Sequence, residues 1–243
     1  LPKNLYYRIF KFAEKKIDKS FACSHGLNDF HEKGGLVEKG QMEVIEHGFN
    51  YNPPPDRMKD YKFGSPQLVL IGRIIKLKGH DFVLEMLTSL KKDYPNIKFV
   101  IVGSGIYEDT LKENVKRLEL EEQVHFAGFQ RNVMDYLASS DIVMVPSYTE
   151  SMPVVILEGF NSKNPVVAFE TIGCRDIIDH NETGILVPAY DTKILEQEVR
   201  RLIEHKEERD RLANNAYEKL NSYYTLKRMT EETIDFFKRH LNK

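Results

Sequence analysis

Two acidic residues, Glu150 and Glu158, bracket the segment Ser151-Met152-Pro153, where an expected strand at residues 142–145 gives way to an expected helix that begins near Pro153. The start of a helix carries unpaired backbone N–H groups and the positive end of the helix dipole, and both favour an anion. Carboxylates repel a phosphate, so we expect them to accept hydrogen bonds from hydroxyl groups of the same ligand. A phosphate together with several hydroxyls indicates a nucleotide sugar. Position alone leaves a simpler interpretation open, namely a capping carboxylate and a solvated helix residue.

A pair of cations follows the expected strand at residues 67–71, in the loop Gly72-Arg73-Ile74-Ile75-Lys76-Leu77-Lys78-Gly79-His80. The two glycines of this loop let the backbone approach a ligand closely. Arg73 and Lys78 fall near the start of the next helix, where they could neutralise a diphosphate. A single Arg or Lys is usually a surface residue. The strand before the loop and the helix after it nevertheless favour the diphosphate role for this pair.

Two further loops follow expected strands. Gly103-Ser104-Gly105 is a lone Gly-x-Gly, which is weak evidence, and we interpret it as a tight turn that borders the ligand. Residues 127–132 include Gly128 and offer backbone groups for the edge of a base, with Phe129 or Arg131 able to stack on it. Phe129 is equally a candidate for the hydrophobic core.

The chain lacks the spacings of several other kinds of site. None of its eight histidines has HExxH-like spacing, although His80 could cap or line the Gly72 loop. Cys23 and Cys174 are far apart in sequence, so we expect reduced thiols and no metal centre. Neither a Gly-x-Ser-x-Gly elbow nor a Walker phosphate loop is present. We therefore expect no cofactor and no metal.

The overall composition is that of an ordinary globular protein, with 243 residues, 41% hydrophobic and 30% charged. A net charge of −2 gives no electrostatic indication of nucleic-acid binding. Residues 1–19, however, carry six cations against two anions, and their apolar residues recur at helical spacing. Such a helix could lie on an anionic membrane surface, but packing of its apolar face against protein is the favoured interpretation.

Short β-branched runs alternate with helical stretches from residue 67 onward, which predicts an α/β fold with a doubly wound parallel sheet. The expected strands are residues 67–71, 98–102, 123–126, 142–145, 165–169 and 185–187, with helices at 81–92 and 109–118. From Asp191 the pattern is helical to the end, with a last helix at 227–240. Before residue 60 only one strand-like piece, residues 20–24, precedes the proline-rich stretch at 52–55, and a single strand cannot form a sheet. Because the chain opens without a start methionine or a signal peptide, we expect residues 1–60 to be the remnant of a truncated N-terminal domain plus linker, followed by a Rossmann-like domain at 61–224.

These residues, taken in order, resemble the retaining glycosyltransferases of family 4, the glycosyl transferases group 1. The resemblance covers nearly the whole chain from about residue 20, and it rests on the following segments: Gly72-Arg73 with Lys78-Gly79-His80, Val102-Gly103-Ser104-Gly105, Phe126-Ala127-Gly128-Phe129, residues 141–147, the pair Glu150 and Glu158, and Thr183-Gly184-Ile185-Leu186-Val187-Pro188. It implies a GT-B architecture, in which two Rossmann-like domains face each other across a cleft and the C-terminal domain holds the nucleotide sugar. The segment 225–243 would be the helix that crosses back to the N-terminal domain. Two departures from the family pattern, His47 for Asn and Asp176 for Glu, weaken a detailed donor assignment.

The resemblance also implies roles for single residues. Arg73 and Lys78 would bind the diphosphate, Glu158 the ribose and Glu150 the transferred sugar, while backbone N–H groups around Ser151, Met152, Pro153 and Val154 would help to hold sugar and phosphates. Arg73, Lys78 and Glu150 are thus the expected catalytic residues, and no metal is required. The expected reaction transfers a sugar from a nucleoside-diphosphate sugar to a glycan or lipid-linked acceptor, with UDP-sugars favoured over GDP-sugars as donors. The expected location is the cytoplasm, at the cytoplasmic face of the membrane if the basic helix contacts lipid. Two alternatives stay open: a GT-B nucleotide-sugar epimerase, and a non-catalytic nucleotide-sugar-binding module. We expect this chain by itself to bind nucleotide weakly and to be inactive.

Overall fold

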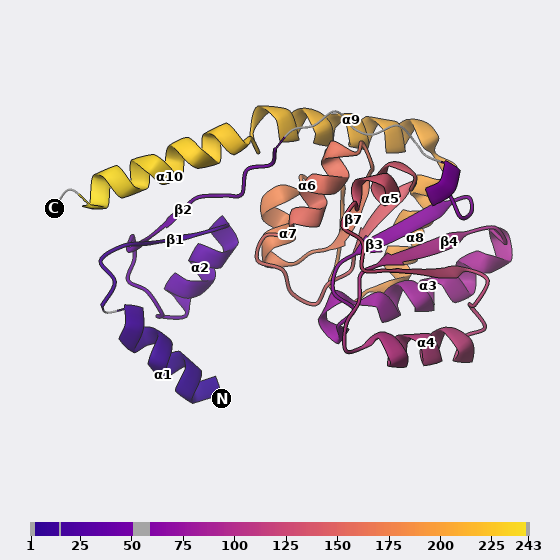
Figure 1. Cartoon of the computed structure of the whole chain (residues 1–243), viewed down its shortest axis with the longest axis horizontal. Coiled ribbons are helices and arrows are strands. Elements are labelled where there is room, and N and C mark those ends of the chain that lie inside the picture. The colour runs from indigo at the N-terminus through magenta and orange to yellow at the C-terminus, as the bar shows by residue number, and fades with distance from the viewer. Residues whose placement is uncertain (1–2, 15, 51–58, 242–243) are drawn as a thin grey trace.

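The computed structural model describes residues 3–14, 16–50 and 59–241. Figure 1 shows a small N-terminal part, with two strands and two helices, beside a larger part built around a six-stranded sheet. The proline-rich stretch at 52–55 lies outside the described residues.

The large sheet confirms the predicted doubly wound α/β fold. Its strands are β3 (Gln67–Ile71), β4 (Lys98–Val102), β5 (Val124–Gly128), β6 (Ile142–Val145), β7 (Val166–Phe169) and β8 (Ile185–Val187). All neighbouring pairs are parallel, in the order β5-β4-β3-β6-β7-β8. The strand order reverses between β3 and β6, and open parallel sheets bind ligands at such a switch point, beyond the carboxyl ends of the strands.

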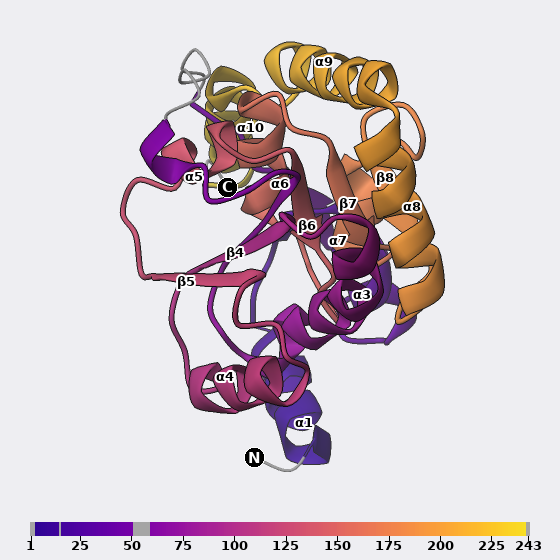
Figure 2. The same cartoon turned by 90° about the vertical axis from the view of Figure 1, so that its right-hand side faces the viewer.

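Helices cover both faces of this sheet, as Figure 2 shows. They are α3 (His80–Asp93), α4 (Glu108–Arg117), α5 (Met134–Ala138), α6 (Val154–Asn161), α7 (Ile172–Ile177), α8 (Thr192–Glu204) and α9 (Lys206–Ser222). Alternate residues of each strand enter two separate cores: in β3, Leu68 and Leu70 pack on the side of α3, whereas Val69 packs on the side of α6. Burial on both faces explains why these strands are continuous apolar runs.

The prediction of a single strand before residue 60 is wrong. Strand β1 (Ser20–Ala22) pairs in parallel with β2 (Met42–Val44), and helices α1 (Lys3–Glu14) and α2 (His25–Lys33) lie beside them. The sequence does not indicate β2, because this strand has only three residues, one of them charged, within a polar, glycine-rich stretch. Tertiary pairing, rather than local propensity, makes it a strand.

Helix α1 buries only part of its apolar face. Phe10 packs against a small core of Ala22, Val37 and Met42. Leu5, Ile9 and Phe12 are exposed. None of the helices in the described part of the chain is long and apolar enough to span a membrane.

The last helix, α10 (Leu226–Leu241), runs from the large part of the molecule to the small one (Figure 1). Its beginning is tied to the segment after β2, because Phe49 N–H donates to the Tyr224 carbonyl at 2.8 Å and Leu226 N–H donates to the Phe49 carbonyl at 3.2 Å. At its far end, Arg239 forms an ion pair with Glu43 of β2 at 2.8 Å. The division into 1–60, 61–224 and 225–243 stays a prediction.

Candidate functional site

The loops that follow β3 and β4 touch each other through their backbones. Gly103 has a φ of +143°, and a Cβ at this position would lie 1.9 Å from the carbonyl oxygen of Gly72. Gly79, with a φ of +72°, comes equally close to the end of β6: its Cβ would lie 1.8 Å from the Pro146 carbonyl oxygen. Only glycine combines this left-handed backbone with such an approach. Glycine therefore lets the loop after β3 pack its backbone directly against the loop after β4 and against the end of β6.

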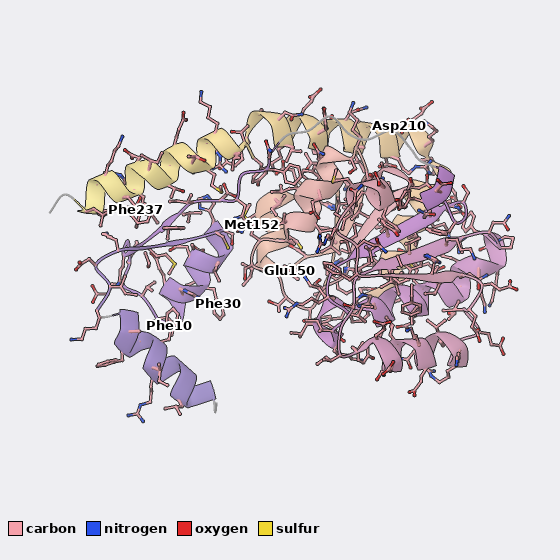
Figure 3. All side chains as sticks on the ribbon, in the orientation of Figure 1. Phe10, Phe30, Glu150, Met152, Asp210 and Phe237 are labelled. Carbon is pink, nitrogen blue, oxygen red and sulfur yellow. The ribbon has the colours of Figure 1, made fainter. Side chains whose placement is uncertain are left out.

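Lys78 and Glu150 meet where the loops after β3 and β6 come together. The Lys78 ammonium donates a hydrogen bond to Glu150 Oε1 at 2.6 Å, with the two side chains 24% and 11% exposed. Lys78 belongs to the short 3₁₀ helix Lys76–Lys78 after β3, whereas Glu150 belongs to the loop after β6. Figure 3 shows Glu150 and Met152 on the side of the large sheet that faces β1, β2 and α2. In this position the Lys78 ammonium can donate hydrogen bonds to a diphosphate, and the Glu150 carboxylate can accept hydrogen bonds from hydroxyl groups.

A pocket of about 300 Å³ opens at the ends of β3, β4 and β5. Its lining comprises Ile71, Gly72, Arg73, Val102, Gly103, Ser104, Phe129, Gln130 and Val133. Arg73 is exposed, and within the described residues its guanidinium makes no hydrogen bond or ion pair. From the sequence, Phe129 could belong either to the hydrophobic core or to the ligand site. Phe129 is 72% exposed, so it is not a core residue. Arg131 is also exposed but does not line this pocket.

The loop from Ser151 to Val154 leads into α6. Pro153 occupies the N-cap position of this helix, and its side chain cannot accept a hydrogen bond, so in the described part of the chain the first N–H groups of α6 receive no cap from this residue. Met152 is buried, and its sulfur accepts the N–H of His47 at 3.3 Å. Ser151 and Val154 are exposed. The helix start is thus accessible beside Glu150, and the contact with His47 ties it to the N-terminal part.

Glu158 lies one turn further along α6. Burial raises the pKa of its carboxyl group, and desolvation is the cause. Within the described part of the chain, no hydrogen bond or ion pair reaches this side chain. A carboxylate held in a partly dry environment without donors is suited to accept hydroxyl groups from a ligand.

Several features of the site were not predicted. The direct contact between Lys78 and Glu150 is one, and Val133 in the pocket lining is another. Gln130 belongs to the loop 127–132 that the sequence indicates for backbone contacts, but its side chain was not predicted in the lining; its amide donates to the Ala127 carbonyl at 2.8 Å. His80 neither caps α3 nor lines the pocket. Its ring is buried with both nitrogens unpartnered among the described residues, and burial lowers its pKa to about 4. The glycines of the loops were the signal that could have predicted the close backbone approaches.

No cluster of three or more His, Cys, Asp or Glu side chains that could hold a metal ion occurs within residues 3–14, 16–50 and 59–241. Cys23 and Cys174 are both free thiols. Burial raises the pKa of Cys174 to about 12, so this thiol stays protonated and unreactive at neutral pH.

The fold and this sheet edge define the class of protein: it has the GT-B glycosyltransferase fold. The structure matches that of Anabaena Alr3699/HepE, solved in complex with UDP, with a TM-score of 0.87 at 20% sequence identity. The match covers 98% of this chain and 68% of the HepE chain.

Residues 57–219 match the model of the glycosyl transferases group 1, and the chain belongs to this family. An uncharacterized glycosyltransferase of Haemophilus influenzae is 31% identical over 156 residues, which are 64% of this chain and 44% of that protein. N-acetyl-alpha-D-glucosaminyl L-malate synthase of Bacillus anthracis is 28% identical over 224 residues, 88% of this chain and 58% of that protein. The chain therefore spans about half the length of these curated relatives. The resemblance to group 1 that the sequence indicated is confirmed.

Proposed function

We propose that this chain is chiefly the donor-binding half of a retaining glycosyltransferase of family 4. It would hold a nucleoside-diphosphate sugar, with UDP-sugars favoured over GDP-sugars, for transfer to a glycan or lipid-linked acceptor. The observation that carries the proposal is the contact between Lys78 and Glu150 at the switch point, next to the pocket that contains the unpaired Arg73. Membership in the glycosyl transferases group 1 supports the reaction class.

Each residue has a task in this proposal. The base enters the pocket beside Phe129, with Arg131 on the same loop just outside the pocket lining, and the ribose hydroxyls bind Glu158. The diphosphate lies against Gly72, Gly103 and Gly128 and is neutralised by Arg73 and Lys78. The sugar binds Glu150 and backbone groups from Ser151 to Val154.

Breaking the bond between sugar and diphosphate builds negative charge on the leaving phosphate and positive charge on the sugar ring. Arg73, Lys78 and the N-terminus of α6 supply positive charge that stabilises the leaving phosphate. The acceptor would attack from the side of the leaving group, which preserves the anomeric configuration. Glu150 orients Lys78 and the sugar, and it has no role as a covalent nucleophile in this scheme.

Calorimetry of this chain with UDP and GDP, each with and without an attached sugar, tests donor binding directly. Binding of none of the four ligands would remove the proposal. In the full-length protein, R73A and K78A should each cost about 3 kcal/mol of transition-state stabilisation, comparable to the loss of an oxyanion donor. Transfer rates within threefold of wild type would contradict these roles.

Analysis of the products separates the two alternatives, an epimerase and a non-catalytic sensor, from the proposed transferase. An epimerase would convert the sugar nucleotide without any acceptor, which NMR of the incubated sugar nucleotide detects. A sensor would bind the ligand and neither hydrolyse nor transfer it. Calorimetry in the presence of acceptor, followed by analysis of the products, distinguishes all three.

We also propose a peripheral contact between α1 and an anionic membrane, at the cytoplasmic face. Leu5, Ile9 and Phe12 are exposed on this helix, and the cations Arg8 and Lys11 are exposed beside them. Apolar insertion combined with attraction to anionic lipid binds such helices to membranes. The full-length protein should float with vesicles that contain phosphatidylglycerol but not with pure phosphatidylcholine, and F12D should abolish flotation. Flotation that is unaffected by F12D would refute the role of α1.

A further inference from the structure

An aromatic cluster lies at the carboxyl ends of β6, β7 and β8, outside the pocket described above. Phe82, Tyr148, Phe169 and Tyr190 form it, with ring centroids 4.9 to 6.1 Å apart. Phe169 is fully buried, whereas Tyr190 is 52% exposed. Tyr190 stacks on Phe82 with an angle of 26° between the rings and approaches Tyr148 at 5.0 Å. Tyr190 therefore forms the accessible edge of the aromatic cluster.

The backbone of Tyr190 is unusual for its residue type. Its φ of +69° lies in the left-handed region, where a bulky side chain is disfavoured and glycine is the ordinary choice. A strained backbone persists where surrounding contacts enforce it, and such residues cluster at binding sites. Here the ring contacts hold an aromatic side chain at a position that glycine would occupy without strain.

An open cavity of about 430 Å³ adjoins Tyr190. Glu85 and Lys193, both exposed, contribute to its lining, as do Asp191 and Thr192. Glu85 Oε2 already accepts the Thr192 hydroxyl at 3.2 Å, and Asp191 caps α8. Within the described residues, the Lys193 ammonium has no partner. The cavity thus combines an aromatic side chain with carboxylates that can accept hydrogen bonds from hydroxyl groups and an ammonium that can donate to them.

The aromatic cluster is connected to the loops that carry Lys78 and Glu150. Tyr148 N–H donates to the Leu77 carbonyl at 2.9 Å, one residue before Lys78, and Glu150 follows Tyr148 by two positions. The Tyr190 hydroxyl is directed to the Tyr148 carbonyl at 3.4 Å. The loops that hold the Lys78 and Glu150 pair are therefore also the support of the aromatic cluster.

We propose that Tyr190 and the adjoining cavity bind a neutral pyranose unit of a glycan, as a saccharide subsite separate from the donor pocket. A pyranose ring has a face of C–H groups that stacks on an aromatic ring and hydroxyl groups around its edge that need polar partners. Two carboxylates against one ammonium disfavour an acidic sugar. The proposal rests on the proposed function in one respect, which is that a glycan acceptor is the source of this sugar.

Calorimetry and saturation-transfer NMR on this chain test the subsite with maltotetraose, cellotetraose and chitotetraose, and with tetragalacturonate as an acidic probe. We expect at least one neutral tetrasaccharide to bind, and the acidic one to bind at least tenfold more weakly. Y190N should weaken the neutral ligand at least tenfold, because Asn tolerates the left-handed backbone but lacks the ring. Y190F keeps the ring and should stay within twofold of wild type.

The matched control is Y217N, which removes another tyrosine that lines an open cavity, on α9, and should leave glycan binding unchanged. Circular dichroism checks that both Asn variants fold. UDP affinity is measured in the same samples and should stay within twofold in Y190N. The subsite is refuted if no neutral tetrasaccharide binds, or if Y190N binds it as wild type does. If the wild-type chain does not bind UDP, the proposed function is refuted instead.

Discussion

The contact between Lys78 and Glu150 permits a quantitative test by a double-mutant cycle. At a separation of 2.6 Å the Coulomb attraction is about 6 kcal/mol for an effective dielectric constant of about 20. Desolvation offsets most of this attraction, because the side chains are only 24% and 11% exposed. Exposed pairs contribute less than about 1 kcal/mol, and loss of one partner of a fully buried pair costs about 3–5 kcal/mol. We therefore expect a coupling energy of about 2 kcal/mol for this partly buried pair.

Urea unfolding of wild type, K78M, E150Q and the double variant measures this coupling without ligand. Calorimetry on the same proteins then assigns the roles. K78M should weaken UDP and UDP-glucose alike, by about 2–3 kcal/mol, because a charged hydrogen bond to the diphosphate is lost. E150Q should weaken UDP-glucose at least about tenfold, or ~1.4 kcal/mol, and leave UDP within threefold.

The ion pair between Lys62 and Asp141 is a matched control, with a distance of 2.5 Å and exposures of 30% and 11%. K62M should destabilise the protein to a similar extent and leave UDP affinity unchanged. A coupling energy below about 0.3 kcal/mol for Lys78 and Glu150 would refute the electrostatic argument. UDP binding in K78M equal to that in K62M would refute the role of Lys78 in the donor site.

Three further predictions concern Glu158, Gly79 and metal ions. Burial raises the pKa of Glu158, so its contribution to stability is full below the ordinary carboxyl pKa and is lost as pH rises through the raised value. E158Q should therefore raise the melting temperature at pH 7 to 8 and not below pH ~4, while nucleotide binding weakens about tenfold; a lower melting temperature at pH 7 would contradict this. G79A should lose more stability in urea unfolding than G35A, because Gly35 has a similar φ of +64° but open space around its Cβ position; equal losses, each near the ~1–2 kcal/mol cost of the left-handed backbone, would show that the contact with Pro146 is unimportant. EDTA should leave UDP affinity within twofold in calorimetry, since Arg73 and Lys78 supply the positive charge, and a tenfold loss would overturn this expectation.

The sequence alone determined the main architecture, because the relevant signals are local. Strands β3, β4, β6 and β8 begin and end at the residues that their apolar runs predict. Strands β5 and β7 occur where predicted, with bounds shifted by one or two residues. β-branched runs between helical stretches specify a parallel sheet that is buried on both faces, wherever the neighbours lie. The same local signals placed Arg73 and Lys78 after β3 and placed Glu150 before α6.

Tertiary structure decided which of these residues meet. Lys78 and Glu150 are 72 positions apart, and they touch because β3 and β6 are neighbours in the sheet, a pairing that no local pattern encodes. The second strand of the small sheet, the exposure of Phe129 and the left-handed Tyr190 above its aromatic support depend on contacts of the same long-range kind. A sequence specifies the conformations that each segment favours, whereas the order in which segments pack determines which side chains share a site.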